Sequence, residues 1–161
     1  MRVREMQHSD APAVASIYNE GIRGRGATFR PEEVGDDHVA AWMDQAERYP
    51  VVVVEDDGQV LGFARAGSYS GFEGYAGVGE LAIYVSAAAR RRGAARALVD
   101  ALAGVCRDRG YWKLIAKVFP SNEASIELLH RCGYRDVGLH LRHGQMPDGE
   151  WRDVLLMEKS L

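Results

Sequence analysis

Apolar residues recur along this chain in two periods, one typical of strands and one typical of helices. Runs that are apolar throughout or at every second position predict strands around Val3 and over residues 51–55, 59–69 and 79–85. Between the first two of these strands, apolar residues recur every three or four positions and predict two helices. The first helix carries Ala13, Ile17 and Tyr18, and the second carries Val39, Trp42, Met43 and Ala46.

The residues after the fourth strand continue this alternation. They predict a helix from Gly93 to about Arg109, a strand over 112–119, a helix over 122–132, and strands over 134–144 and 151–159. Asp56-Asp57-Gly58 signals a hairpin turn, Pro12 the start of the first helix, and Gly133 the end of the last one. This order indicates an α/β or α+β domain without regular βαβ winding. No linker or repeat interrupts it, so residues 1–161 are predicted to form a single domain.

Composition and charge narrow the function classes. With a formal charge of −3, the chain has no general basic field to hold nucleic acid or an anionic membrane surface. Apolar runs such as VVVV at 51–54 are far shorter than the roughly 20 residues that cross a bilayer, and the first ten residues lack a hydrophobic signal segment. Cys106 and Cys132 have no CxxC pattern and no metal-ligand spacing, which favours free thiols and no metal. We therefore expect a cytoplasmic protein.

The stretch ARRRGAARAL at residues 89–98 places successive arginines directly before a predicted helix. A helix N-terminus presents free N–H groups and the positive end of the helix dipole, so it favours an anion and disfavours uncompensated cations. Small residues after the arginines let a diphosphate approach the backbone, and the guanidinium groups can bind its oxygens. A solvated arginine run without function is the alternative. The segment is neither a Walker loop nor GxGxxG.

Several segments together resemble a known enzyme family. The R-x-x-G-x-A pattern of Arg90, Gly93 and Ala95 is similar to the acetyl-CoA pyrophosphate loop of the GCN5-related N-acetyltransferases (GNAT). The other matching segments of the chain resemble the phosphinothricin N-acetyltransferase branch, and within it the arsinothricin-resistance enzymes. The matching segments are IYNEGI at 17–22, ATF at 27–29, YAGVGELAIYV at 75–85, FPSNEAS at 119–125, GYRDVG at 133–138 and RHGQMPDGEWRDV at 142–154.

This resemblance implies a fold and a cofactor. The fold is a mixed, mostly antiparallel sheet that splays between strands 4 and 5 and is flanked by about four helices. The cofactor is acetyl-CoA. A homodimer is implied as well, with the C-terminal strands and the helix pair near the pocket as the contact. The resemblance assigns cofactor binding to Ile83, Tyr84, Val85, Arg90, Arg91, Arg92, Gly93, Ala94, Ala95, Arg96 and Asn122. From the sequence alone, Asn122 can equally be a helix cap after Pro120 and Ser121.

Glu80 matches the glutamate that the family uses as general base. An amine attacks a thioester only after its ammonium form has lost a proton to a nearby acceptor. Deprotonation at pH 7 costs roughly 1 kcal/mol for an α-amino group and about 4–5 kcal/mol for a lysine amine, so a single carboxylate suits an α-amino acid. Without the resemblance, a lone glutamate in a strand is more often a solvent-facing side chain.

The resemblance also implies an acceptor site made of Phe29, Phe72, Tyr75, His143 and Trp151. The aromatic residues can equally be core or interface residues, and His143 can be a surface histidine. Two positions depart from the family. Phe72 replaces an arginine suited to an acidic substrate. Either another arginine, such as Arg23, Arg25, Arg30 or Arg65, supplies that charge, or the acceptor is different and less acidic. Leu129 replaces a tyrosine that acts as general acid in many relatives.

Three hypotheses follow from these observations. The first is acetylation of the α-amino group of phosphinothricin, arsinothricin or methionine sulfoximine, with Glu80 as base, which gives resistance to a toxic amino-acid analogue. The second keeps the enzyme class but changes the acceptor to another small amine or a protein N-terminus. The third is a non-catalytic acetyl-CoA sensor, which would not need a base.

Overall fold

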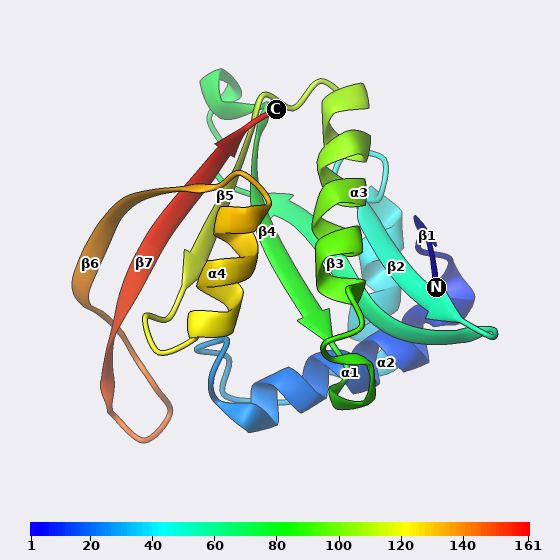
Figure 1. The fold of residues 1–161 in the computed structure, drawn as a ribbon, viewed down its shortest axis with the longest axis horizontal. Coiled ribbons are helices and arrows are strands. Elements are labelled where there is room, and N and C mark those ends of the chain that lie inside the picture. The colour runs from blue at the N-terminus through cyan, green and yellow to red at the C-terminus, as the bar shows by residue number, and fades with distance from the viewer.

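The strands predicted from the apolar runs form one seven-stranded sheet in the computed structural model, which describes residues 1–161 (Figure 1). The strand order is β1-β2-β3-β4-β5-β7-β6. All neighbouring strands are antiparallel except β4 and β5. The strands are β1 (Arg2–Glu5), β2 (Val51–Asp56), β3 (Gln59–Ser68), β4 (Val78–Val85), β5 (Lys113–Val118), β6 (Arg135–Gln145) and β7 (Trp151–Ser160).

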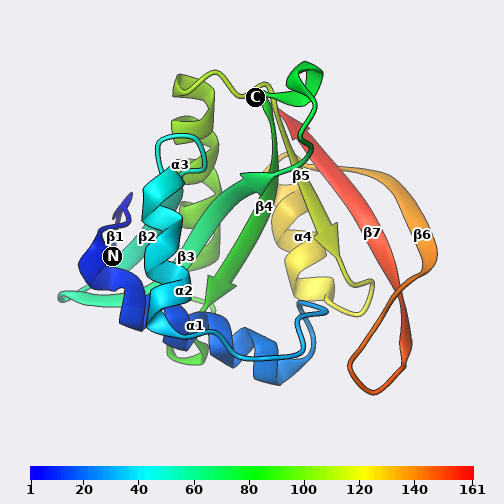
Figure 2. The ribbon, with the colours of Figure 1, turned by 180° about the vertical axis from the view of Figure 1, so that it is seen from behind.

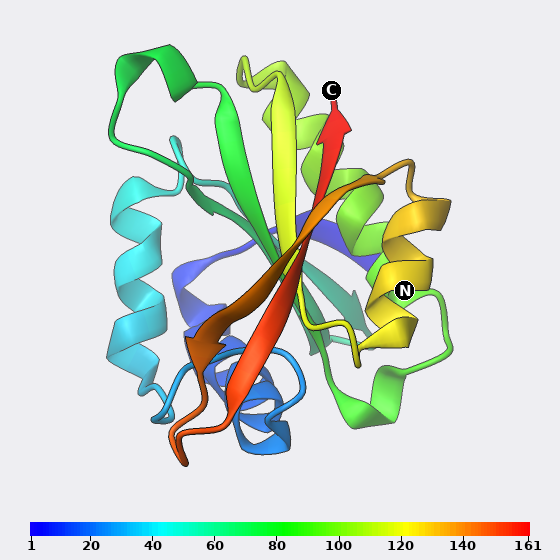
Figure 3. The same ribbon diagram turned by 90° about the vertical axis from the view of Figure 1, so that its left-hand side faces the viewer.

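Four α-helices cover the two faces of this sheet. They are α1 (Ala11–Gly24), α2 (Asp36–Ala40), α3 (Ala94–Asp108) and α4 (Glu123–Arg131). Seen edge-on in Figure 3, α1 and α2 lie on one face and α3 and α4 on the other. Figure 2 shows α1 and α2 from behind, crossing the strands. None of the helices is long and apolar enough to cross a membrane. The predicted element order and the α+β class are confirmed.

The four valines of β2 show why both faces carry helices. Val52 and Val54 belong to the large core cluster with Leu98 and Leu102 of α3. Val51 and Val53 point the other way and pack in a second cluster with Val14 of α1. Side chains alternate between the two faces of a strand, so an uninterrupted apolar run is stable only where both faces are covered. The run VVVV therefore predicts a central strand between two helix layers.

The parallel pair β4 and β5 is short. Their register covers only Val78–Leu81 against Lys113–Ala116, after which β4 continues along β3 and β5 continues along β7. The sheet therefore opens in its middle, in agreement with the predicted splay between strands 4 and 5. Backbone groups of β4 beyond Leu81 face this opening instead of a neighbouring strand.

Several boundaries follow the predicted turn chemistry. Asp57 and Gly58 have φ values of 48° and 78°, which is the geometry of a type I′ hairpin. Gly133 has a φ of 87° just after α4, as predicted for a helix end. The second helix differs from the prediction, because α2 ends at Ala40 and residues Ala41–Gln45 form a 3-10 helix. Trp42 is still buried, so the tighter winding keeps the apolar face towards the core.

Candidate active site

A cleft of about 440 Å³ occupies the opening between β4 and β5. It passes through the sheet, since its lining comes from α4 on one face and from α1 and the following loop on the other. The lining residues are Tyr18, Ala27, Thr28, Phe29, Glu80, Leu81, Ala82, Ile83, Tyr84, Ala116, Lys117, Val118, Phe119, Asn122, Ser125, Leu129, His143, Gly144 and Val154. A cleft that opens on both helix layers can receive one molecule from each side.

Glu80 lies at the point where the two strands part. It pairs with Ile115 in the short parallel register, and its carboxylate accepts a hydrogen bond from Lys117 Nζ at 3.0 Å. About a third of the Glu80 side chain remains exposed, at 34%. Lys117 was not singled out from the sequence. The signal available there was its place on the neighbouring strand, but only the parallel register brings it beside Glu80.

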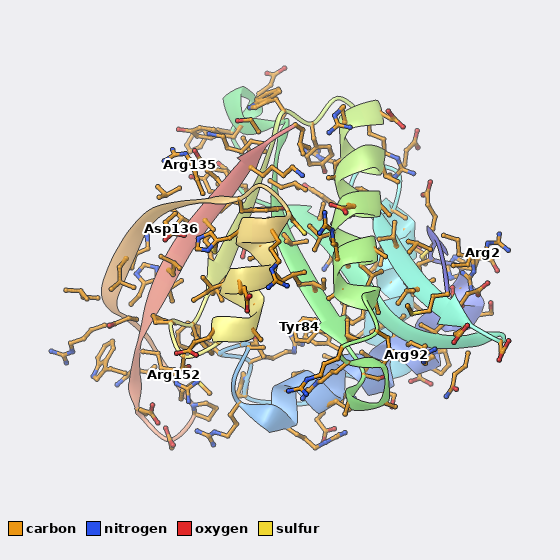
Figure 4. The ribbon with its side chains drawn as sticks, viewed as in Figure 1. Arg2, Tyr84, Arg92, Arg135, Asp136 and Arg152 are labelled. Atoms are coloured by element: carbon orange, nitrogen blue, oxygen red, sulfur yellow. The ribbon has the colours of Figure 1, made fainter.

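Tyr84 forms the floor of the cleft on the α1 side. Its ring stacks on Phe63 at a centroid distance of 5.4 Å and contacts Tyr18 at 4.8 Å. The close approach of α1 requires Gly21, because a Cβ there would lie 2.5 Å from the Tyr84 ring. Burial raises the pKa of Tyr84, so its phenol stays neutral at physiological pH. Figure 4 labels Tyr84 at the end of β4 that faces the opening.

The wall on the other face comes from α4. The Asn122 side chain accepts a hydrogen bond from the Ser125 N–H at 3.3 Å, which makes it the helix cap, and it also lines the cleft. Leu129 is buried and lines the cleft without offering a proton. His130 points elsewhere and interacts with Asp136 at 2.8 Å. This side of the cleft therefore presents the Asn122 amide, the Ser125 hydroxyl and otherwise mainly apolar surface.

The arginine stretch forms a tight loop ahead of α3. Arg91 has a φ of 63° and Gly93 a φ of 81°, and α3 begins at Ala94, one residue later than predicted. Such a loop turns successive backbone N–H groups towards one concave side, which suits an anion. Arg92 pairs with Asp56 of β2 at 2.5 Å, whereas Arg90 and Arg91 have no acidic partner within 4.0 Å. Arg92 is labelled beside this loop in Figure 4.

The structure divides the predicted acceptor residues into two groups. Phe29 and His143 line the cleft, and Phe29 packs directly on Gly144, where a Cβ would lie 2.6 Å from its ring. Phe72, Tyr75 and Trp151 lie outside the cleft and are exposed. Of the strand residues predicted to bind cofactor, Ile83 and Tyr84 line the cleft and Val85 does not.

Comparisons with known proteins agree with this geometry. The sequence profile of the Acetyltransferase (GNAT) family matches residues 13–134. The L-methionine sulfoximine/L-methionine sulfone acetyltransferase of Pseudomonas aeruginosa is 32% identical, over 99% of this chain and 94% of the relative. The phosphinothricin N-acetyltransferase of Alcaligenes faecalis is 31% identical, over 99% of this chain and 82% of the relative.

A solved structure extends the comparison to the fold. The acetyltransferase yncA from Salmonella typhimurium, solved with its cofactor acetyl-CoA, superposes with a TM-score of 0.94 at 30% identity. The match covers 100% of this chain and 94% of that one. The predicted family and the predicted resemblance to phosphinothricin acetyltransferases are confirmed. This chain belongs to the GNAT family of acetyltransferases.

Proposed function

We propose that this enzyme transfers the acetyl group of acetyl-CoA to the α-amino group of a small amino acid of the methionine sulfoximine, phosphinothricin or arsinothricin type. Both substrates are bound together, and Glu80 acts as the general base. The acetylated product no longer carries a basic amine, so the reaction gives resistance to a toxic amino-acid analogue. The names of the two curated relatives support this acceptor class.

The position of Glu80 in the cleft is the main support for this function. Its carboxylate lies in the cleft at the parting of β4 and β5, where the α1 side and the α4 side of the cleft meet. An ammonium group that enters from the α1 side reaches this carboxylate and can give up its proton there. Lys117 holds one carboxylate oxygen, Oε2, which leaves the other free to accept that proton.

The residues of the cleft and of the arginine loop fit acetyl-CoA, which supplies an acetyl group activated as a thioester. The free backbone edge of Ile83, Tyr84 and Val85 can pair with the amides of the pantetheine arm as a strand would. The loop from Arg90 to Arg96 can hold the diphosphate through its N–H groups and through the unpaired guanidinium groups of Arg90 and Arg91. Asn122 can contact the arm from the α4 side.

Acceptor binding is assigned to the predicted aromatic residues and His143. Phe29 and His143 can contact the acceptor directly, since both line the cleft. Phe72, Tyr75 and Trp151 are exposed outside the cleft, and only the family resemblance assigns them to acceptor binding. Leu129 stands at the position of the usual tyrosine and has no proton to give, so the proton for the leaving thiolate is assigned to water.

A homodimer is part of the proposal. Strand β6 is the outer strand of the sheet and carries exposed Val137, Leu139 and Leu141. An apolar edge strand of this kind is normally covered in a native assembly. Analytical ultracentrifugation tests this, with a dimer expected for the wild type and a monomer for Leu139→Glu combined with Leu141→Glu. A monomeric wild type contradicts it.

Release of coenzyme A tests the acetyl transfer. Purified enzyme is supplied with acetyl-CoA and with methionine sulfoximine, phosphinothricin, arsinothricin, ordinary amino acids, polyamines or a peptide. Turnover confined to the amino-acid analogues supports the proposal. Turnover of only a neutral amine or the peptide contradicts the acceptor class and leaves the enzyme class standing.

Substitution of Glu80 tests its role. Glu80→Gln is expected to lower kcat by about 10²- to 10⁴-fold, as for loss of a general base, while acetyl-CoA binding measured by calorimetry is retained. Glu47→Gln is the matched control, because the Glu47 side chain is exposed and makes no hydrogen bond or ion pair. Unchanged turnover in Glu80→Gln contradicts the role as base. Acetyl-CoA binding without turnover of any acceptor by the wild type indicates a sensor instead.

A further inference from the structure

Two arginines on the α1 side of the sheet have no acidic partner. Arg65 comes from β3, and Arg30 from the loop after α1. In both residues Nε is buried without a hydrogen-bond partner. The Arg65 guanidinium lies over the Trp42 ring at 4.5 Å, and that of Arg30 lies 5.9 Å from the Tyr18 ring centroid. Aromatic rings therefore hold both guanidinium groups in place of carboxylates.

Neither arginine has a carboxylate within ion-pair distance, and a third basic side chain lies beside them. Burial lowers the pKa of Arg65, and its electrostatic neighbours are the phenols of Tyr18 and Tyr49. His38 lies beside the same cluster, where burial and then the charges of Arg30 and Arg65 lower its pKa. Both arginines are half-buried. Withdrawing a cation from water without an anion beside it is unfavourable, and stacking on an aromatic ring offsets only part of that cost. An anion bound between these basic side chains would compensate their charge.

Other arginines near the cleft already have partners. Arg23 pairs with Glu33, and Arg25 pairs with Asp148 at 2.9 Å. Phe72, which stands where related enzymes place an arginine, is 76% exposed and carries no charge. Among the four arginines that the sequence offers as replacements, only Arg30 and Arg65 are therefore free to bind a substrate anion.

Arg65 is also close to the proposed base. It pairs with Ala82 on β4, so both side chains lie on the same face of the sheet, and Glu80 lies on that face two residues further along. Diagonal neighbours of this kind lie roughly 7–8 Å apart, and their Cβ atoms are somewhat closer. The residues between them are Ala82 and Gly67, which leave space for a ligand. Arg30 approaches from the other direction, over Tyr18, which lines the cleft.

We infer that Arg65, with Arg30 beside it, binds an oxyanion of the acceptor while the acceptor's amine lies at Glu80. The acceptor is then an amino acid with a free acid group, and a neutral amine is a poor substrate. This inference rests on the proposed function. It assigns the positive charge that Phe72 lacks to Arg65 on β3. The oxyanion can be the α-carboxylate or an acid group on the side chain, and the two are separated by experiment.

The test compares acceptors that carry different acid groups. Methionine sulfoximine and its C-terminal amide share a side chain, while phosphinothricin adds a side-chain phosphinate. In Arg65→Gln, kcat/KM for methionine sulfoximine is expected to fall about 10- to 100-fold, the usual effect of losing a charged hydrogen bond, and to change less than about threefold for the amide. A loss confined to phosphinothricin supports the side-chain phosphinate as the partner. Equal losses for the acid and the amide overturn the inference.

Further variants separate recognition from folding. Arg65→Lys keeps the charge and is expected to recover part of the preference for the acid over the amide. Arg48→Gln is the control, because Arg48 also lies over an aromatic ring, at 5.3 Å from Tyr49, but is exposed. Arg65→Met removes the unpaired charge and is expected to keep or raise the Tm while the acid preference is lost.

A lower Tm together with equal losses for acid and amide identifies a structural role and overturns the inference. If the wild type acetylates no amino acid, the proposed function itself fails, which is a different result from equal losses in the variant.

Discussion

Lys117 Nζ donates a hydrogen bond to Glu80 Oε2 at 3.0 Å, across the line where β4 and β5 separate. Both side chains are partly exposed, so the pair contributes at most about 1 kcal/mol to stability. The hydrogen bond matters for position, because a carboxylate that is held at one oxygen points its other oxygen in a defined direction. The two residues are 37 apart in the sequence, and only the parallel register brings them together.

Removal of this lysine is therefore expected to affect catalysis more than folding. In Lys117→Met, the Glu80 carboxylate can rotate, and kcat is expected to fall about 10-fold, as for loss of one positioning contact. Lys117→Gln keeps a donor and should retain more activity than Lys117→Met. Steady-state kinetics and thermal unfolding check both effects. A Tm decrease of many degrees with normal kcat would show that the pair is structural.

The left-handed conformation of Arg91 predicts opposite effects on stability and on cofactor binding. Its φ of 63° costs roughly 1 kcal/mol in a residue with a side chain. Arg91→Gly relieves that strain but removes a cation from the loop. We expect unchanged or slightly higher stability and a several-fold higher KM for acetyl-CoA. Urea unfolding and initial-rate kinetics measure the two quantities, and an unchanged KM would mean that Arg91 does not contact the cofactor.

Asp10 predicts a pH-dependent contribution to stability. It is 7% exposed and forms a two-pronged ion pair with Arg4, at 2.7 and 2.9 Å. Arg4 holds the pKa of Asp10 below its usual 3.8, so the stabilisation is present above pH 3.8 and is lost as the pH falls through the lower folded value. Asp10→Asn should cost about 2–3 kcal/mol at pH 7 and less at pH 3, where protonation has begun to favour the unfolded chain. Urea unfolding at both pH values checks this, and a cost independent of pH contradicts it.

The two cysteines should be silent towards thiol reagents in the folded enzyme. Both thiols are free and buried, and burial raises the pKa of Cys106 to about 12 and also raises that of Cys132. Because the thiolate is the reactive form, a thiol reagent should react slowly with native protein and rapidly after unfolding in urea. Rapid labelling of native protein would contradict the buried placement. Slow labelling also means that release of coenzyme A can be followed directly with such a reagent.

Local patterns predicted the order of the elements, and the physical reason is that each signal acts over a few residues. The type I′ turn at Asp57 and Gly58, the Asn122 cap and the end of α4 at Gly133 depend on neighbouring backbone groups only. The winding of residues 41–45 as a 3-10 helix was not predicted. In this segment Trp42 packs against Phe63 and Arg65, which are distant in the sequence and leave no local signal.

The cleft was harder to predict because it combines distant strands. The resemblance led to Glu80, Asn122, Phe29 and His143, which do line one cavity. Lys117 was missed, and the exposure of Phe72, Tyr75 and Trp151 was not foreseen, since composition does not distinguish a loop that covers a site from one that faces solvent. The sequence offered four arginines for binding an anionic group of the acceptor. Arg23 and Arg25 have acidic partners in the structure, whereas Arg65 has none, and the sequence did not reveal these pairs.

The free edge of β4 has a consequence for how such an enzyme can change over evolutionary time. Main-chain N–H and C=O groups are the same whatever side chain is present, so a donor held by Ile83, Tyr84 and Val85 through the backbone tolerates sequence drift. In the proposed function the acceptor is bound instead by individual side chains, such as Phe29 in the cleft and Arg65 beside it. Exchange of a few of these can move the preference from one amine to another while the acetyl donor stays the same.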